Sequence, residues 1–126
     1  MNKITVIGSG NVGSTIAYTL TIMGIASEIV MIDVNEEKSL GEALDIRQGV
    51  SFCSPTAVYA GSYNDAKDSD IVVITSGMAR KPGQSRLDLA QANVDIINHI
   101  ENSIFIIIIH MLKLHMVIKC IKLNCR

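Results

Sequence analysis

Short, continuous apolar runs alternate along the chain with segments whose apolar residues recur at helical spacing. Continuous runs are typical of parallel strands, because helices cover both faces of such a sheet. Strands are expected at residues 3–7, 28–32, 57–60, 71–75 and 103–109, and helices at about 11–23, 35–49 and 86–101. In the last helix the apolar side comprises Leu87, Ala90, Val94 and Ile97. Strictly alternating strands and helices predict an α/β fold built on a right-handed, doubly wound parallel sheet.

Composition and charge then narrow the classes of function. The 126 residues are 48% hydrophobic, enough for one domain with its own core and without disulfides or a metal. The 11 basic and 12 acidic side chains nearly balance, which argues against DNA, RNA or an anionic membrane as a partner. The N-terminal residues do not resemble a secretion signal, and the most apolar stretch, 104–118, is shorter than the roughly 20 residues that span a bilayer. We therefore expect a cytoplasmic protein without a membrane span.

A glycine-rich motif, Gly8-Ser9-Gly10-Asn11-Val12-Gly13, lies between the first expected strand and the first expected helix. Gly8 permits a sharp turn, Gly10 lets a pyrophosphate approach the backbone, and Gly13 lets the helix pack against the strand. Asp33 ends the next strand, where its carboxylate would accept hydrogen bonds from ribose hydroxyls and repel a 2′-phosphate. This combination predicts dinucleotide binding and favours NAD over NADP.

A basic loop, Arg80-Lys81-Pro82-Gly83-Gln84-Ser85-Arg86, follows the fourth expected strand. Ligands of open α/β sheets bind at this carboxyl edge, and a guanidinium suits a carboxylate or a developing alkoxide. A solvated basic loop is the alternative, and the spacing alone leaves both interpretations open.

These motifs, together with Gly41–Asp45 and the run Thr75–Leu89, resemble the L-lactate/malate dehydrogenase family over about residues 1–109. The resemblance implies a Rossmann-type NAD-binding domain and hydride transfer between NAD and a small 2-hydroxy acid. It implies a homo-oligomer for the full-length enzyme. It also implies that this chain is truncated before the catalytic domain, since the family's histidine, aspartate and carboxylate-binding arginine follow this half.

The resemblance assigns further site residues as well. Arg86 matches the arginine that polarises the reacting carbonyl, and Arg80 matches the position that reads the substrate side chain. Additional cofactor contacts fall on Ser76, Gly77, Met78 and Asn93. Lactate enzymes usually carry glutamine and malate enzymes arginine at the position of Arg80, so malate dehydrogenase is our first expectation. L-lactate dehydrogenase and a non-catalytic NAD-binding fragment are the alternatives, and the chain by itself is expected to be inactive.

The resemblance stops abruptly after Ile109. Residues 1–109 carry 7 basic and 12 acidic side chains, whereas 110–126 carry 4 basic and no acidic ones. We therefore predict an NAD-binding domain over 1–109 and an anomalous tail over 110–126, for which a frameshift is our hypothesis. Cys120 and Cys125 have no second ligand pair, so we expect neither a metal site nor a disulfide there.

Overall fold

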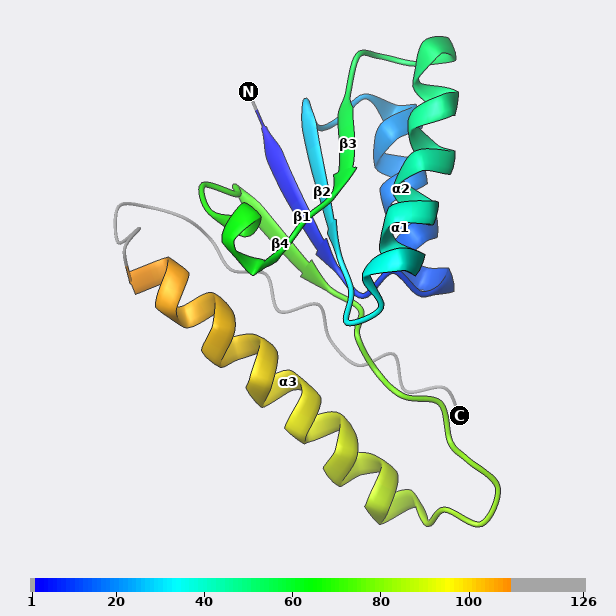
Figure 1. The fold of residues 1–126 in the computed structure, drawn as a ribbon, viewed down its shortest axis with the longest axis vertical. Coiled ribbons are helices and arrows are strands. Elements are labelled where there is room, and N and C mark those ends of the chain that lie inside the picture. The colour runs from blue at the N-terminus through cyan, green and yellow to red at the C-terminus, as the bar shows by residue number, and fades with distance from the viewer. Residues whose placement is uncertain (1, 110–126) are drawn as a thin grey trace.

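The computed structural model describes the chain from residue 2 to residue 109, with side chains to residue 104, so the predicted tail lies outside the described residues. The elements are β1 (Lys3–Ile7), α1 (Asn11–Met23), β2 (Glu28–Ile32), α2 (Glu36–Gly49), η1 (Val50–Phe52), β3 (Ala57–Ala60), η2 (Tyr63–Ala66), β4 (Ile71–Ile74) and α3 (Arg86–Ile109) (Figure 1).

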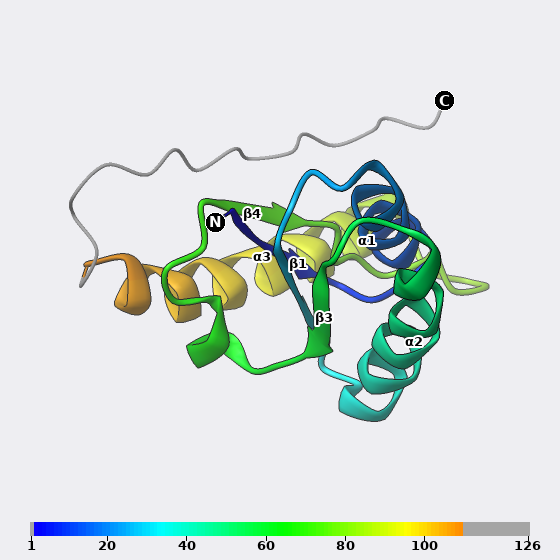
Figure 2. The same ribbon diagram turned by 90° about the horizontal axis from the view of Figure 1, so that it is seen from above.

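The four strands form one parallel sheet in the order β3-β2-β1-β4. From β1 the chain first moves outward to β2 and β3 and then crosses back to place β4 on the other side of β1. In register, Ile4 lies between Ile29 of β2 and Ile71 of β4. Helices α1 and α2 cover one face of the sheet and α3 lies against the other (Figures 1 and 2). The predicted doubly wound parallel sheet is therefore confirmed.

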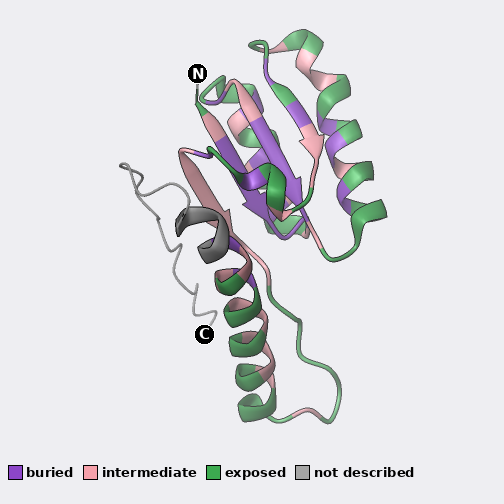
Figure 3. Cartoon of the chain, turned by 60° about the vertical axis from the view of Figure 1, so that its left-hand side comes forward, coloured by how far each residue is buried: buried purple, intermediate pink, exposed green. Residues whose placement is uncertain are grey.

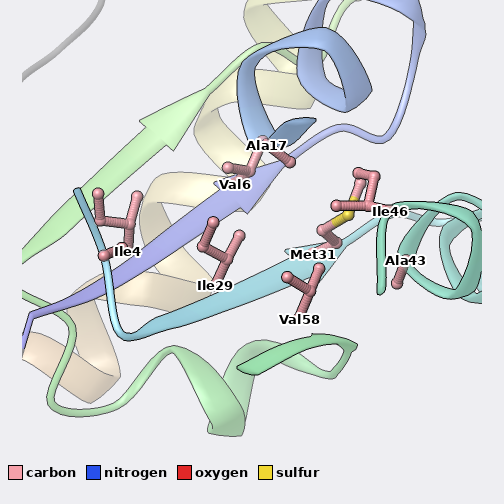
Figure 4. Packing of buried hydrophobic residues seen from close by; sticks show 9 residues of the cluster. Ile4, Val6, Ala17, Ile29, Met31, Ala43, Ile46 and Val58 are labelled. Carbon is pink, nitrogen blue, oxygen red and sulfur yellow. The ribbon is translucent and has the colours of Figure 1, made fainter. Parts of the chain in front are cut away.

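Each face of the sheet has its own apolar cluster, because successive strand residues point to opposite sides. In β2, Ile29 and Met31 pack toward α1 and α2, as Figure 4 shows, whereas Val30 and Ile32 belong to the cluster on the α3 side. All four are buried. Burial on both faces explains why β2 reads as a continuous apolar run.

The strand predicted at 103–109 is wrong, because α3 continues as a helix through this segment. An apolar run does not by itself distinguish a buried strand from a buried helix, and α3 contains no glycine or proline to end it. The Ser103 hydroxyl donates to the carbonyl of His99, one turn earlier, over 2.9 Å. Ile100 and Ile104, also one turn apart, are both buried in the same cluster.

The side of α3 that packs on the sheet also differs from the predicted one. Leu87 is 82% exposed and Val94 46% exposed, whereas the contact is made by Ile96, Ile100 and Ile104. The first turns of α3 project beyond the sheet and are mostly exposed (Figure 3). Between residues 2 and 109, no helix is both long enough and apolar enough to cross a membrane.

Candidate dinucleotide site

The candidate site lies at the carboxyl edge of the sheet, next to the point where the chain order reverses. Because β1, β2 and β4 are parallel, the residues that follow them meet at this edge. Gly8 follows β1, Asp33 follows β2 and Thr75 follows β4. Such a reversal point is where open α/β sheets bind their ligands.

The turn after β1 is held from both neighbouring strands. The Gly8 amide donates to the Ile32 carbonyl over 2.7 Å, and the Thr75 hydroxyl donates to the Gly8 carbonyl over 2.9 Å. Gly8 has a φ of +100°, and a Cβ there would lie 2.8 Å from the Ser76 amide nitrogen. The first glycine of the motif is thus required both by its conformation and by the closeness of the chain after β4.

The other two glycines have opposite surroundings. A Cβ on Gly13 would lie 1.8 Å from the Gly8 carbonyl oxygen, so α1 packs directly on the turn. A Cβ on Gly10 would meet nothing within 4 Å. Gly10 is also the N-cap of α1 and provides no side-chain cap for the first amides of the helix. Open space above exposed helix amides fits a pyrophosphate, since these amides donate hydrogen bonds and the helix N-terminus favours negative charge.

Asp33 lies beside this turn. Its Oδ2 accepts a hydrogen bond from the Ser9 amide over 2.6 Å, and its Oδ1 accepts one from the Asn35 amide over 3.0 Å. The structure therefore brings together the glycine-rich motif and the acidic residue that the sequence paired by spacing. The carboxylate is partly exposed at the edge where a ribose would lie.

One residue beside the glycine-rich turn was missed by the sequence analysis. The hydroxyl of Ser39 in α2 lies 3.0 Å from that of Ser9. Ser39 belongs to no recognisable motif, and only the folded chain brings it to the turn. Burial, and then the negative charge of Asp33, raise the pKa of Tyr63.

The remaining residues of the glycine-rich motif divide into two kinds. The Ser9 side chain is fully buried, so only its backbone is available to a ligand. Asn11 and Val12, in the first turn of α1, are exposed, Val12 by 59%. Their predicted contacts with a cofactor stay predictions.

The predicted cofactor contacts after β4 lie together. Asn93 in α3 accepts a hydrogen bond from the Met78 amide over 2.8 Å through Oδ1. A Cβ on Gly77 would lie 3.6 Å from the same oxygen, and Ser76 borders the Gly8 turn. Asn93 thus connects α3 to the segment leaving the sheet edge, although the two positions are 15 residues apart in sequence.

The two arginines flank an exposed loop. The Arg80 Nε donates to the Gln84 carbonyl over 2.8 Å, so part of its guanidinium holds the loop itself. Arg86 is the first residue of α3. The preceding Ser85 caps the helix: the Asp88 amide donates to Ser85 Oγ over 3.1 Å, and the Ser85 hydroxyl donates to the Asp88 carboxylate over 2.6 Å. The segment between β4 and α3, which carries this loop, extends away from the sheet (Figures 1 and 3).

No group of three or more histidine, cysteine, aspartate or glutamate side chains suited to a metal occurs in the described part of the chain. His99 makes an edge-to-face contact with Tyr63, with ring centroids 6.5 Å apart. The site therefore consists of backbone amides, one carboxylate and an amide side chain.

A doubly wound parallel sheet with this glycine-rich turn, helix N-terminus and carboxylate defines a dinucleotide-binding domain of the Rossmann type. The profile of the lactate/malate dehydrogenase NAD-binding domain matches residues 2–112. The chain belongs to the lactate/malate dehydrogenase family, and its NAD-binding assignment is confirmed at the level of the family.

Relatives and solved structures agree with this assignment. An L-lactate dehydrogenase of Thermoanaerobacter sp. (strain X514) is 56% identical over 100 residues, covering 79% of this chain and 32% of the relative. An L-lactate dehydrogenase of Acetivibrio thermocellus is 46% identical over 104 residues, which cover 82% of this chain and 33% of the relative. The chain thus spans about a third of the length of these relatives.

Among solved structures, the minor L-lactate dehydrogenase of Enterococcus mundtii matches with a TM-score of 0.81 and 40% identity, covering 83% of this chain and 34% of that one. The malate dehydrogenase of Archaeoglobus fulgidus in complex with NADH matches with a TM-score of 0.76 and 38% identity, and the match covers 83% of this chain and 36% of that one. Both substrate types therefore share this fold.

Proposed function

We propose that this chain is the cofactor-binding part of an NAD-dependent 2-hydroxy acid dehydrogenase whose substrate pair is L-lactate and pyruvate. The observation that carries the proposal is the open glycine-rich turn beside Asp33, in a chain that is 56% identical to an L-lactate dehydrogenase over 100 residues. NAD, when bound, supplies hydride transfer. A cytoplasmic location and a homo-oligomeric full-length enzyme remain part of the proposal.

The residues of this chain would bind and orient the reactants. The amides at the start of α1 would hold the pyrophosphate, and Asp33 would accept hydrogen bonds from the ribose hydroxyls. Met78 and Asn93 would position the cofactor where the chain leaves β4. Arg86 would polarise the substrate carbonyl from the start of α3, where a guanidinium has the planar donor geometry that a developing alkoxide requires.

The relatives favour lactate over the malate preference that Arg80 suggested. The two curated relatives above, 56% and 46% identical, are both L-lactate dehydrogenases. The solved structures do not discriminate, because the L-lactate dehydrogenase and the malate dehydrogenase above are 40% and 38% identical. The Nε–H of Arg80 is also bonded to its own loop. Malate is the second candidate, because a cation at Arg80 would pair with a second carboxylate and would face the methyl group of pyruvate without a partner.

A chimaera tests the substrate. Residues 1–109 of this chain replace the corresponding part of the Thermoanaerobacter enzyme, and kcat/KM is measured for pyruvate and oxaloacetate with NADH. We expect the chimaera to prefer pyruvate, and R80Q to increase that preference by about tenfold or more, as loss of an unpaired charge facing a methyl group predicts.

The parent enzyme and the K81Q variant, which removes a neighbouring charge from the same loop, are the controls. Preference of the chimaera for oxaloacetate would replace lactate by malate. An unchanged ratio in R80Q would remove Arg80 from the specificity role. A titration of the 126-residue chain with NADH tests the cofactor half separately.

A further inference from the structure

The Ser9 side chain points into the protein, where it meets a second buried hydroxyl. Ser9 is fully buried and Ser39 is 2% exposed, and their Oγ atoms lie 3.0 Å apart. The Ser39 hydroxyl donates to the Met31 carbonyl over 3.1 Å. Because the proton of Ser39 is used on that carbonyl, the Ser9 hydroxyl is the donor to Ser39. The result is a directed chain of hydrogen bonds from the turn through α2 to β2.

The backbone of Ser9 is held at the same time from the ligand side. Its amide donates to Asp33 Oδ2 over 2.6 Å. Met31 of β2, where this series of hydrogen bonds ends, lies two residues before Asp33, and the Gly8 amide donates to the carbonyl of the intervening Ile32. The turn that faces the phosphates and the strand that carries the carboxylate are thus joined through both the backbone and the side chain of one residue.

We propose that Ser39 is a positioning residue for the adenosine diphosphate half of the dinucleotide. Through Ser9 it fixes the glycine-rich turn relative to Asp33, so that phosphates and ribose meet one preorganised unit. Ser39 does not touch the ligand itself. The inference rests on the NAD binding proposed above, and it adds a residue outside every motif found in the sequence.

A hydrogen bond, rather than packing alone, gives Ser39 this role. Both hydroxyls are buried, and a buried donor left without its acceptor costs free energy. Removing the Ser39 hydroxyl leaves the Ser9 hydroxyl without its acceptor, which favours rotation of Ser9 and movement of its amide away from Asp33. Preorganised contacts lose affinity when their supporting hydrogen bonds are removed, even when the contacts themselves remain.

The test uses S39A in the 126-residue chain, with NADH and ADP-ribose as the titrated ligands. We expect both to bind about two- to tenfold more weakly, the range that corresponds to one buried hydrogen bond. Amide hydrogen exchange of Ser9, read by NMR without ligand, should become faster in S39A because the bond to Asp33 is weakened.

Two further variants separate positioning from general stability. T56V removes another buried hydroxyl, which donates to the Ala26 carbonyl over 2.9 Å at the opposite edge of the sheet. We expect T56V to lower the thermal midpoint without changing NADH affinity or the exchange of Ser9. S9A should weaken binding as S39A does, and the double variant S9A/S39A should be no weaker than either single variant, because both remove the same bond.

The outcomes are distinct. Unchanged exchange of the Ser9 amide in S39A, or additive effects in the double variant, would overturn the positioning role. Loss of affinity in T56V equal to that in S39A would reduce the effect to general stability and would also overturn it. A wild-type chain that does not bind NADH would instead refute the proposed function, and the exchange measurement would then decide the positioning role without ligand.

Discussion

The three glycines of the motif occupy one turn but are required for three physical reasons. Gly8 has a positive φ, Gly13 lies against the Gly8 carbonyl, and Gly10 borders open space. The sequence motif already assigned a different role to each position, and the space around each glycine in the structure predicts a different consequence of substitution. Substitution by alanine can therefore separate folding from binding within six residues.

The pair G10A and G13A makes this separation measurable. In G13A the new Cβ would lie 1.8 Å from the Gly8 carbonyl oxygen, so the helix or the turn must move. We expect a loss of unfolding free energy of about 3 kcal/mol, in the upper range for overpacked sites.

G10A has room for its methyl group, so we expect near-normal stability. We also expect at least about tenfold weaker NADH binding, which corresponds to a loss of about 1.4 kcal/mol in binding free energy. Urea unfolding and NADH titration report the two effects, and normal NADH binding by G10A would contradict the assigned phosphate position.

At the amino edge of the sheet, Tyr59 gives a pH dependence with a definite sign. Its hydroxyl donates to Glu28 over 2.5 Å, and burial followed by this bond raises its pKa from 10.0 to about 12. The fold favours the protonated phenol, so this contribution is complete below pH 10 and is lost as the pH rises from about 10 to about 12. Y59F should be less stable than the wild type by about 1 kcal/mol at pH 7.

The measurement is urea unfolding of wild type and Y59F from pH 7 to pH 11.5, and the difference between them should narrow above pH 10. Y18F, which changes a half-exposed tyrosine on α1, is the control and should follow the wild type. A difference that stays constant above pH 10 would contradict the raised pKa of Tyr59.

Among the elements, the first four strands and the starts of the three long helices were predicted, whereas the end of α3 and the short helices η1 and η2 were not. The strands 3–7 and 28–32 are continuous apolar runs closed by a turn or an acidic residue, and the structure has both with these bounds. The segment 103–109 is also a continuous apolar run, yet it extends α3. Sequence pattern alone does not choose between helix and strand there, because the choice depends on what the segment packs against.

The packed side of α3 can be tested with one buried and one exposed residue. Ile100 is 3% exposed and belongs to the apolar cluster on the α3 side of the sheet, whereas Leu87 is 82% exposed. We expect I100A to lower the unfolding free energy by about 2–4 kcal/mol, as for other buried isoleucines, and L87A to change it by less than about 0.5 kcal/mol. Urea unfolding gives both values. An equal loss of unfolding free energy in L87A and I100A would mean that the side of α3 predicted from sequence, which includes Leu87, packs on the sheet after all.

For the whole molecule, the site was predictable where its partners follow a fixed spacing and not where they come from distant elements. Gly8 and Asp33 were found together because the strand, turn and helix between them have a standard length. Ser39 reaches the same turn from α2, and Thr75 reaches it from the position after β4; only the folded sheet places them there. The positions of the arginines relative to the site depend on the loop after β4 and were likewise beyond sequence reasoning.

Cofactor binding should also stabilise the whole fold, with a preference set by the charge of Asp33. A ligand that binds only the native state raises the unfolding free energy by about 2.7 kcal/mol at 100 times its Kd. We expect NADH to raise the thermal midpoint of the 126-residue chain more than an equal concentration of NADPH does, because the Asp33 carboxylate repels a 2′-phosphate. D33N removes the charge, so it should narrow the gap between the two ligands, with each shift measured from the variant's own midpoint without ligand. That midpoint should itself fall, because only one of the two side-chain atoms that accept from the Ser9 and Asn35 amides remains an acceptor. Equal shifts by NADH and NADPH in the wild type would show that Asp33 does not face the ribose.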